Sequence, residues 1–117
     1  TILSQTLGIA CAKYARIKIV HAIGSFIRIS DNLGIKSLFE AEVERCNELI
    51  KYAEEISFEN KNAIFFFDEP MHSTPPIEGT ATSIAVVEYL SKLPNIKILL
   101  TTHYYELTQL EKRYPNN

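Results

Sequence analysis

Residues 63–69 read Ala-Ile-Phe-Phe-Phe-Asp-Glu, and this run constrains the fold more than any other part of the chain. A short, unbroken apolar run rich in aromatic side chains predicts a strand buried on both faces, as in a parallel sheet. Asp68 and Glu69 would then lie at the carboxyl edge of the sheet, where open α/β folds bind ligands. The competing interpretation is a strand followed by a simple polar loop, because this pattern is frequent.

A second apolar run, residues 96–100, also ends in polar side chains, the last of which is His103. Between the two runs, residues 70–79 contain three prolines and a glycine. We expect irregular structure there, followed by a helix from Thr80. Alternating strands and helices imply parallel strands. The polar ends of both runs should therefore meet at one edge, which brings Asp68, Glu69 and His103 together.

The clearest helical pattern covers residues 37–56. Apolar residues spaced by four and three place one face of the helix toward the core; they are Phe39, Val43, Cys46, Ile50 and Ala53. Ser37 is a good N-cap, and Glu40 three residues later completes a capping box. The positive end of this helix can bind an anion through Ser37 and the free N–H groups, although a simple cap explains the serine equally well.

Shorter patterns complete the chain. We expect the end of a helix at residues 1–7 stopped by Gly8, a short strand at 9–12, a strand or turn at 17–20, a strand at 25–29, a loop at 30–37 and a short helix at 104–112. Together they predict a single α/β domain over 1–117 with a largely parallel sheet. Because the chain begins within a helical pattern, we expect this domain to be incomplete at its N-terminus.

Composition narrows the class of protein. With 46% hydrophobic and 22% charged residues, the chain is typical of soluble globular domains. A net charge of −2 gives no electrostatic footprint for nucleic acid or membrane, and no apolar run is long enough to span a bilayer. Cys11 and Cys46 lie in apolar patterns, which predicts buried, reduced thiols and an intracellular location, cytoplasmic or nuclear.

The predicted edge suits metal-assisted phosphoryl transfer. Magnesium keeps several waters, so Asp68, acting through water, is a sufficient ligand set together with substrate phosphates. Glu69 is placed to activate an attacking water, and His103 to donate to a phosphate oxygen, unless it is only a structural histidine. A zinc or iron site made of Asp68, Glu69, His72 and His103 is a further alternative.

One component of such chemistry is absent from the 117 residues. Hydrolysis of a nucleoside triphosphate on this architecture needs a glycine-rich loop, G-x-x-x-x-G-K-[ST], and the chain contains no such run. We expect that loop just upstream of Thr1, and we expect the chain on its own to be inactive.

The order of these motifs resembles the ATPase domain of the MutS DNA mismatch-repair family, which belongs to the ABC class of P-loop ATPases. The run at 63–69 looks like the Walker B strand of that family, and TTHYYELTQL at 101–110 is very similar to its switch-histidine segment. GIKSLFEAEV at 34–43 resembles the signature stretch of the family, and SFIRIS at 25–30 resembles its F-T-R-I-G segment. QTLGIACA at 5–12 resembles the stretch where the helix after the phosphate loop meets the next strand. The likeness covers essentially the whole chain.

The resemblance implies a three-layer P-loop NTPase fold and roles for individual residues. Asp68 would hold Mg²⁺, Glu69 would activate water, and His103 would be the switch histidine. Ser37 would reach the γ-phosphate of ATP in a partner subunit, so that a homodimer or heterodimer sandwiches the nucleotides. DNA would be contacted by other domains of the parent protein.

The loop after Walker B departs from the family pattern. The family usually has I-G-R-G-T-S-T-x-x-G, whereas residues 70–79 read PMHSTPPIEG and keep only Ser73, Thr74 and Gly79 as equivalents. The resemblance implies that Ser73 and Thr74 help to bind the nucleotide. In this divergence the loop resembles that of MutS relatives carried by large DNA viruses.

Two other interpretations of the chain stay open: a dimerisation module that does not hydrolyse ATP, and a different ABC-type ATPase. The retained Glu69 argues against the first and the Y-x-E-L after His103 against the second.

Overall fold

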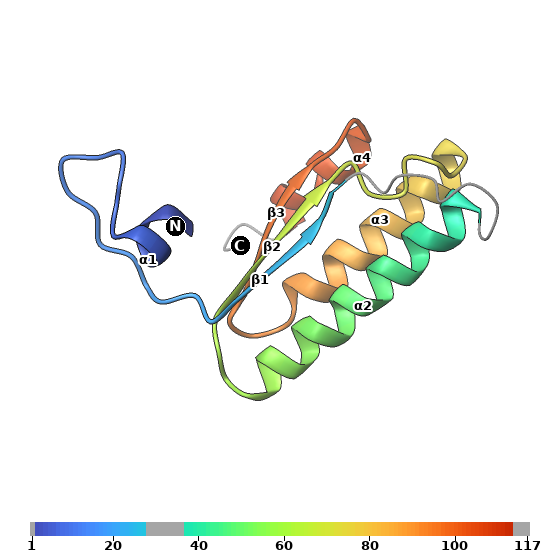
Figure 1. Cartoon of the computed structure of the whole chain (residues 1–117). Helices are drawn as coiled ribbons and strands as arrows, with labels where there is room; N and C mark the ends of the chain where they lie inside the picture. Colours follow the sequence, from blue (N-terminus) through green and yellow to red (C-terminus); the bar gives the residue numbers. More distant parts are fainter. Residues whose placement is uncertain (1, 28–36, 114–117) are drawn as a thin grey trace.

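The computed structural model describes residues 2–27 and 37–113 and shows an α/β fold on a three-stranded parallel sheet (Figure 1). The strands are β1 (Ala22–Phe26), β2 (Ala63–Asp68) and β3 (Ile96–Thr101), in the order β1-β2-β3. The register pairs Asp68 with Thr101, so β2 and β3 end together at one edge of the sheet. The strands predicted at 63–67 and 96–100 are confirmed.

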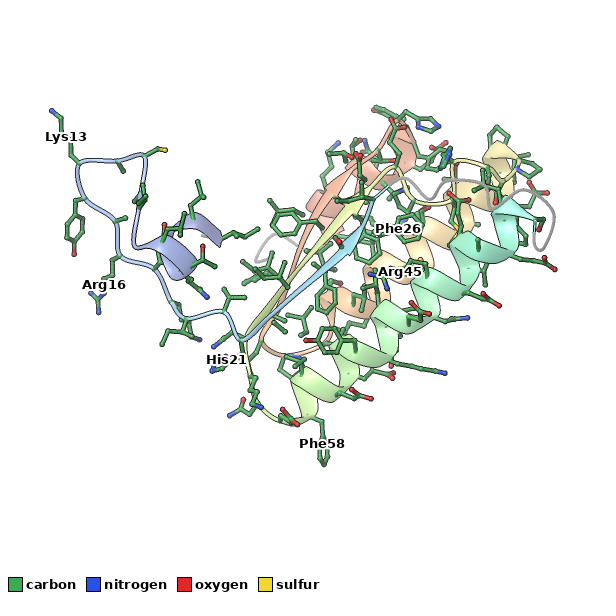
Figure 2. The ribbon with its side chains drawn as sticks, viewed as in Figure 1. Lys13, Arg16, His21, Phe26, Arg45 and Phe58 are labelled. Carbon is green, nitrogen blue, oxygen red and sulfur yellow. The ribbon has the colours of Figure 1, made fainter. Side chains whose placement is uncertain are left out.

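Two long helices, α2 (Leu38–Phe58) and α3 (Pro76–Ser91), cover one face of the sheet (Figure 1). The other helices are short: α1 (Ile2–Leu7), α4 (Tyr105–Thr108) and α5 (Leu110–Arg113). Between the sheet and the long helices lies the core, where the rings of Phe26 and Phe67 stack with their centroids 5.8 Å apart. In Figure 2, Phe26 points from β1 toward α2, whereas Phe58 at the end of α2 points into solvent.

No long helix of the described residues covers the opposite face of the sheet, which we call the open face, and this corrects the prediction that the strand at 63–67 is buried on both faces. Side chains alternate along β2 between buried and half-buried positions. On the neighbouring strands, Ile23 and Leu99 are exposed on the open face. The reason is that α2 and α3 both pack on the same side.

β1 begins three residues earlier than the strand predicted at 25–29 and contains Gly24 in its middle. A Cβ on Gly24 would lie 2.3 Å from Cδ1 of Phe65 and 3.1 Å from Cδ2 of Leu49. The glycine therefore lets the Phe65 ring and α2 approach the strand closely, which a sequence pattern cannot reveal.

The helix α3 starts at Pro76, not at Thr80, so residues 76–79 are helical and the prediction of irregular structure throughout 70–79 is wrong. Proline is tolerated in the first turn because its missing N–H has no intrahelical partner there. Gly79 is buried within the helix and its N–H bonds the carbonyl of Pro75 at 2.8 Å.

Several weaker predictions are also corrected. Residues 9–12 form no strand, and Cys11 is exposed, not buried. Of the two alternatives left open for 17–20, the strand is not formed. The helix expected at 104–112 is two short helices, α4 and α5. The loop expected at 30–37 lies outside the described residues except for Ser37. Within the described ranges, no helix has the length and apolar character needed to cross a membrane.

Candidate functional site

Asp68 and Glu69 lie where β2 leaves the sheet. The hydroxyl of Thr101 on β3 donates a hydrogen bond to Oδ1 of Asp68, and the N–H of Glu69 donates to the Thr101 carbonyl at 3.0 Å. The second of these bonds continues the sheet pairing by one residue, so the backbone of the acid pair is held by the neighbouring strand. Glu69 itself adopts a left-handed backbone conformation, with φ of 46°, which turns the chain out of the strand direction.

His103, two residues after the end of β3, lies beside this pair. Its Nδ1 is 3.7 Å from Oε1 of Glu69. The two side chains are 57% and 56% exposed, so a reactant in solution can reach both. The His103 ring also packs against Tyr104, with 4.4 Å between the ring centroids. The parallel arrangement therefore brings the carboxylate and the imidazole to one edge.

The segment 70–75, which we call the post-acid loop, connects the acid pair to α3 and is fixed from two directions. The hydroxyl of Ser83 on α3 donates to the carbonyl of Pro70 at 3.1 Å, and the hydroxyl of Tyr104 donates to the carbonyl of Met71 at 3.0 Å. Burial, together with the negative charges of Glu42 and Glu69, raises the pKa of the Tyr104 hydroxyl, so it stays protonated as a donor.

A third contact to the post-acid loop comes from α2. Glu42, which is fully buried, accepts hydrogen bonds from the N–H of Ser73 at 3.3 Å and from its hydroxyl. Its other oxygen lies 2.7 Å from Nδ1 of His72. His72 is therefore paired with Glu42 and not with the acid pair. Among the described residues no group of three or more possible ligands could hold a metal ion, so the four-residue zinc or iron site is wrong.

Two other loop residues considered for nucleotide binding face inward. The Ser73 hydroxyl is bonded to Glu42, and the Thr74 hydroxyl is buried without a hydrogen-bond partner in the described part of the chain. Neither hydroxyl lies on the solvent side, where Glu69 and His103 are exposed.

Ser37 caps α2 with the predicted capping box. Its hydroxyl accepts from the N–H of Glu40 at 3.2 Å, and its own N–H donates to Oε2 of Glu40 at 3.1 Å. Figure 1 shows that the N-terminus of α2 lies at the same end of the molecule as the post-acid loop and the carboxyl ends of the strands. The helix is also tied to β1 by Arg45, whose Nη2 donates to the Ser25 carbonyl at 3.1 Å (Figure 2).

Sequence reasoning missed the structural roles of Thr101, Tyr104 and Glu42. A signal for Glu42 was present, because the buried residues of α2 repeat at spacings of four, three, four and three. These are Glu42, Cys46, Leu49, Ala53 and Ile56. A glutamate that starts an otherwise apolar stripe is a buried carboxylate that needs a partner.

Comparisons with known proteins agree on one family. A family model described as MutS domain V matches residues 1–117. The DNA mismatch repair protein MutS of Finegoldia magna is 38% identical over 116 residues, which cover 98% of this chain and 13% of that protein. The proteins of the same name from Acholeplasma laidlawii and Carboxydothermus hydrogenoformans are 32% and 31% identical over 115 residues each, again covering 97% of this chain and 13% of theirs.

Proposed function

Because the chain belongs to the MutS family, we propose that residues 1–117 are the C-terminal part of an ATP-hydrolysing domain with the ABC-type P-loop fold. In the full-length protein, the domain would couple its nucleotide state to DNA binding by other domains. The chain spans only 13% of the length of these relatives, so this activity is proposed for the whole protein. The chain alone, which has no phosphate-binding loop motif, is expected to be inactive.

A single observation carries the proposal: Asp68, Glu69 and His103 meet at the carboxyl edge of adjacent parallel strands. Ligands of open α/β sheets bind at this edge. A groove on the open face of the sheet borders it, lined in part by Phe66, Asp68 and Thr101. Asp68 is thus accessible from the open face as well as from the edge.

The oxygen donors at the edge fit magnesium better than a softer metal. Asp68 is exposed, and the Thr101 hydroxyl orients one of its oxygens and leaves the other accessible. A carboxylate with one free oxygen suits an ion that keeps most of its waters and takes its remaining ligands from phosphates. Mg²⁺ bound with ATP would neutralise charge on the phosphates.

Each neighbouring residue then has a separate role. Glu69 accepts the proton of the attacking water, and His103 donates a hydrogen bond to the γ-phosphate. Ser37, at the positive end of α2, contacts the γ-phosphate held by a partner subunit, so that a homodimer or heterodimer encloses ATP. Ser73 and Thr74 would reach nucleotide only if the post-acid loop rearranged.

That inward placement favours a competing proposal, a dimerisation module that binds or senses nucleotide without hydrolysing it. ATP turnover separates the two. Full-length protein is assayed with Mg²⁺ and with excess chelator, and Asp68→Asn is compared with Asp68→Glu. Magnesium-dependent turnover that the Asn variant loses supports hydrolysis. No turnover in the wild-type protein, with retained ATP-dependent dimerisation, would favour the module.

A further inference from the structure

We propose that Glu42 is a positioning residue that ties the signature helix α2 to the post-acid loop and thereby holds Glu69 in place. The inference rests on the proposed function, because the role of Glu69 comes from there. Glu42 itself touches neither edge residue, so it acts through the loop.

The burial of Glu42 is the first argument. Its side chain is 0% exposed, although it lies only five residues after the N-cap, in a turn whose other side chains are exposed or half-buried. A carboxylate taken out of water is strongly unfavourable unless hydrogen bonds and an opposite charge compensate it. Ser73 donates two hydrogen bonds to Oε2, and Nδ1 of His72 lies 2.7 Å from Oε1, which has no hydrogen-bond partner among the described residues.

The second argument is where those partners lie. His72 and Ser73 are in the middle of the post-acid loop, which begins directly after Glu69. Glu69 and Met71 both have positive φ, 46° and 61°, which non-glycine residues adopt only when their surroundings impose it. The contacts of Glu42 are part of those surroundings, together with the hydrogen bonds from Ser83 and Tyr104.

The third argument is connectivity. Ser37 caps the turn that precedes Glu42, and a hydrogen-bonded helix end moves as a unit. A displacement of the α2 N-terminus would therefore pull on His72 and Ser73, and through them on Glu69. The other ionisable groups influenced by Glu42 are Cys46 on α2 and Tyr104 after β3, both of which stay neutral near pH 7.

The test measures the loop and the turnover separately in the full-length protein. Amide hydrogen exchange of a peptide covering 69–75 is followed without nucleotide for wild type, Glu42→Gln and Glu42→Ala. We expect exchange to rise about tenfold or more in the Ala variant, as loss of hydrogen bonds to a charged group implies, and less in the nearly isosteric Gln variant. In parallel, kcat for ATP should fall about tenfold while KM stays within about twofold, since positioning of a base affects turnover and not binding.

Two further variants sharpen the result. Glu55→Gln makes the same chemical change at an exposed position of α2 and should leave exchange and kcat unchanged. His72→Gln should also loosen the loop, and the double variant should be no worse than Glu42→Gln alone, because His72 acts through its contact with Glu42.

The outcomes separate the two proposals. If the wild-type protein does not hydrolyse ATP, the proposed function fails, and the exchange data still decide whether Glu42 fixes the loop. If the wild type hydrolyses ATP but Glu42→Gln and Glu42→Ala match it in kcat, the positioning role is overturned, whether or not the loop exchanges faster. Additive effects of the Glu42 and His72 substitutions would also contradict it.

Discussion

Nδ1 of His103 lies 3.7 Å from Oε1 of Glu69, although the two residues follow different strands. The parallel register that pairs Asp68 with Thr101 produces this proximity, because it makes β2 and β3 end at the same level. An edge built in this way presents a carboxylate and an imidazole to the same reactant without any need for a loop to fold over them.

Substitution of His103 should reduce turnover more than nucleotide affinity. His103→Ala removes the proposed donor to the γ-phosphate, and we expect kcat of the full-length protein to fall about 10- to 100-fold, as for a lost hydrogen bond to a charged group. His103→Gln keeps a donor near the same position and should recover part of the rate. Steady-state ATPase kinetics measure both, and an Ala variant with wild-type kcat would remove His103 from the site.

Gly79→Ala should destabilise the fold at the post-acid loop. The new Cβ would lie 2.5 Å from the Tyr104 hydroxyl and 2.9 Å from the Met71 carbonyl, so the hydrogen bond between them must break or shift. We expect a loss of about 1–3 kcal/mol in the free energy of unfolding from this overpacking, even though alanine favours a helix more than glycine.

Tyr104→Phe is the matched control for the glycine substitution. It removes only the hydroxyl, and we expect a cost of about 1 kcal/mol from the unpaired carbonyl. Because it also removes the closest contact, that with the hydroxyl, Gly79→Ala should cost less in the Tyr104→Phe background, although the contact with the Met71 carbonyl remains. Denaturant unfolding of all four proteins checks this, and strictly additive effects would show that the close approach is unimportant.

The two cysteines should differ sharply in reactivity. Burial, reinforced by the charge of Glu42, raises the pKa of the Cys46 thiol from its ordinary value of 9.0 to about 12, whereas Cys11 is exposed. At pH 8 the thiolate fraction of Cys46 is about a thousandfold lower than that of an ordinary thiol. Alkylation of the native protein followed by peptide mass spectrometry should therefore label Cys11 first. Equal labelling rates would contradict the burial of Cys46.

The same shift predicts how stability changes with pH. The raised pKa means that the folded state favours the neutral thiol, while the unfolded chain ionises near pH 9. The contribution of Cys46 to stability is thus complete below pH 9 and is lost as the pH rises toward 12. Cys46→Ala should show a shallower loss of unfolding free energy across that range than the wild type does.

The sequence predicted the parts of the site that depend on local patterns. The apolar runs before Asp68 and His103 became adjacent strands, and Ser37 with Glu40 formed the capping box. Such features follow from a few neighbouring residues, and the parallel arrangement follows from their alternation with helices.

The remainder depended on tertiary contacts that no local pattern encodes. The prediction placed Phe39 on the buried face of α2, whereas the helix is rotated so that Glu42 is buried and Phe39 is 45% exposed. The difference arises because the post-acid loop covers the carboxylate, with Ser73 bonded to one oxygen and Nδ1 of His72 2.7 Å from the other. Likewise, the strand was predicted to begin at residue 25, whereas Gly24 lies inside it, where its missing side chain makes room for Phe65.

The most direct test of the acid pair is single-turnover ATP hydrolysis by the full-length protein with Glu69→Gln. Removing a general base typically costs about 10²–10⁴ in rate, so the variant should bind Mg²⁺-ATP, retain it unhydrolysed on a desalting column and show almost no phosphate release. If Glu69→Gln hydrolyses bound ATP at the wild-type rate, the carboxylate beside His103 is not the base, and the edge of the sheet is not the site of hydrolysis.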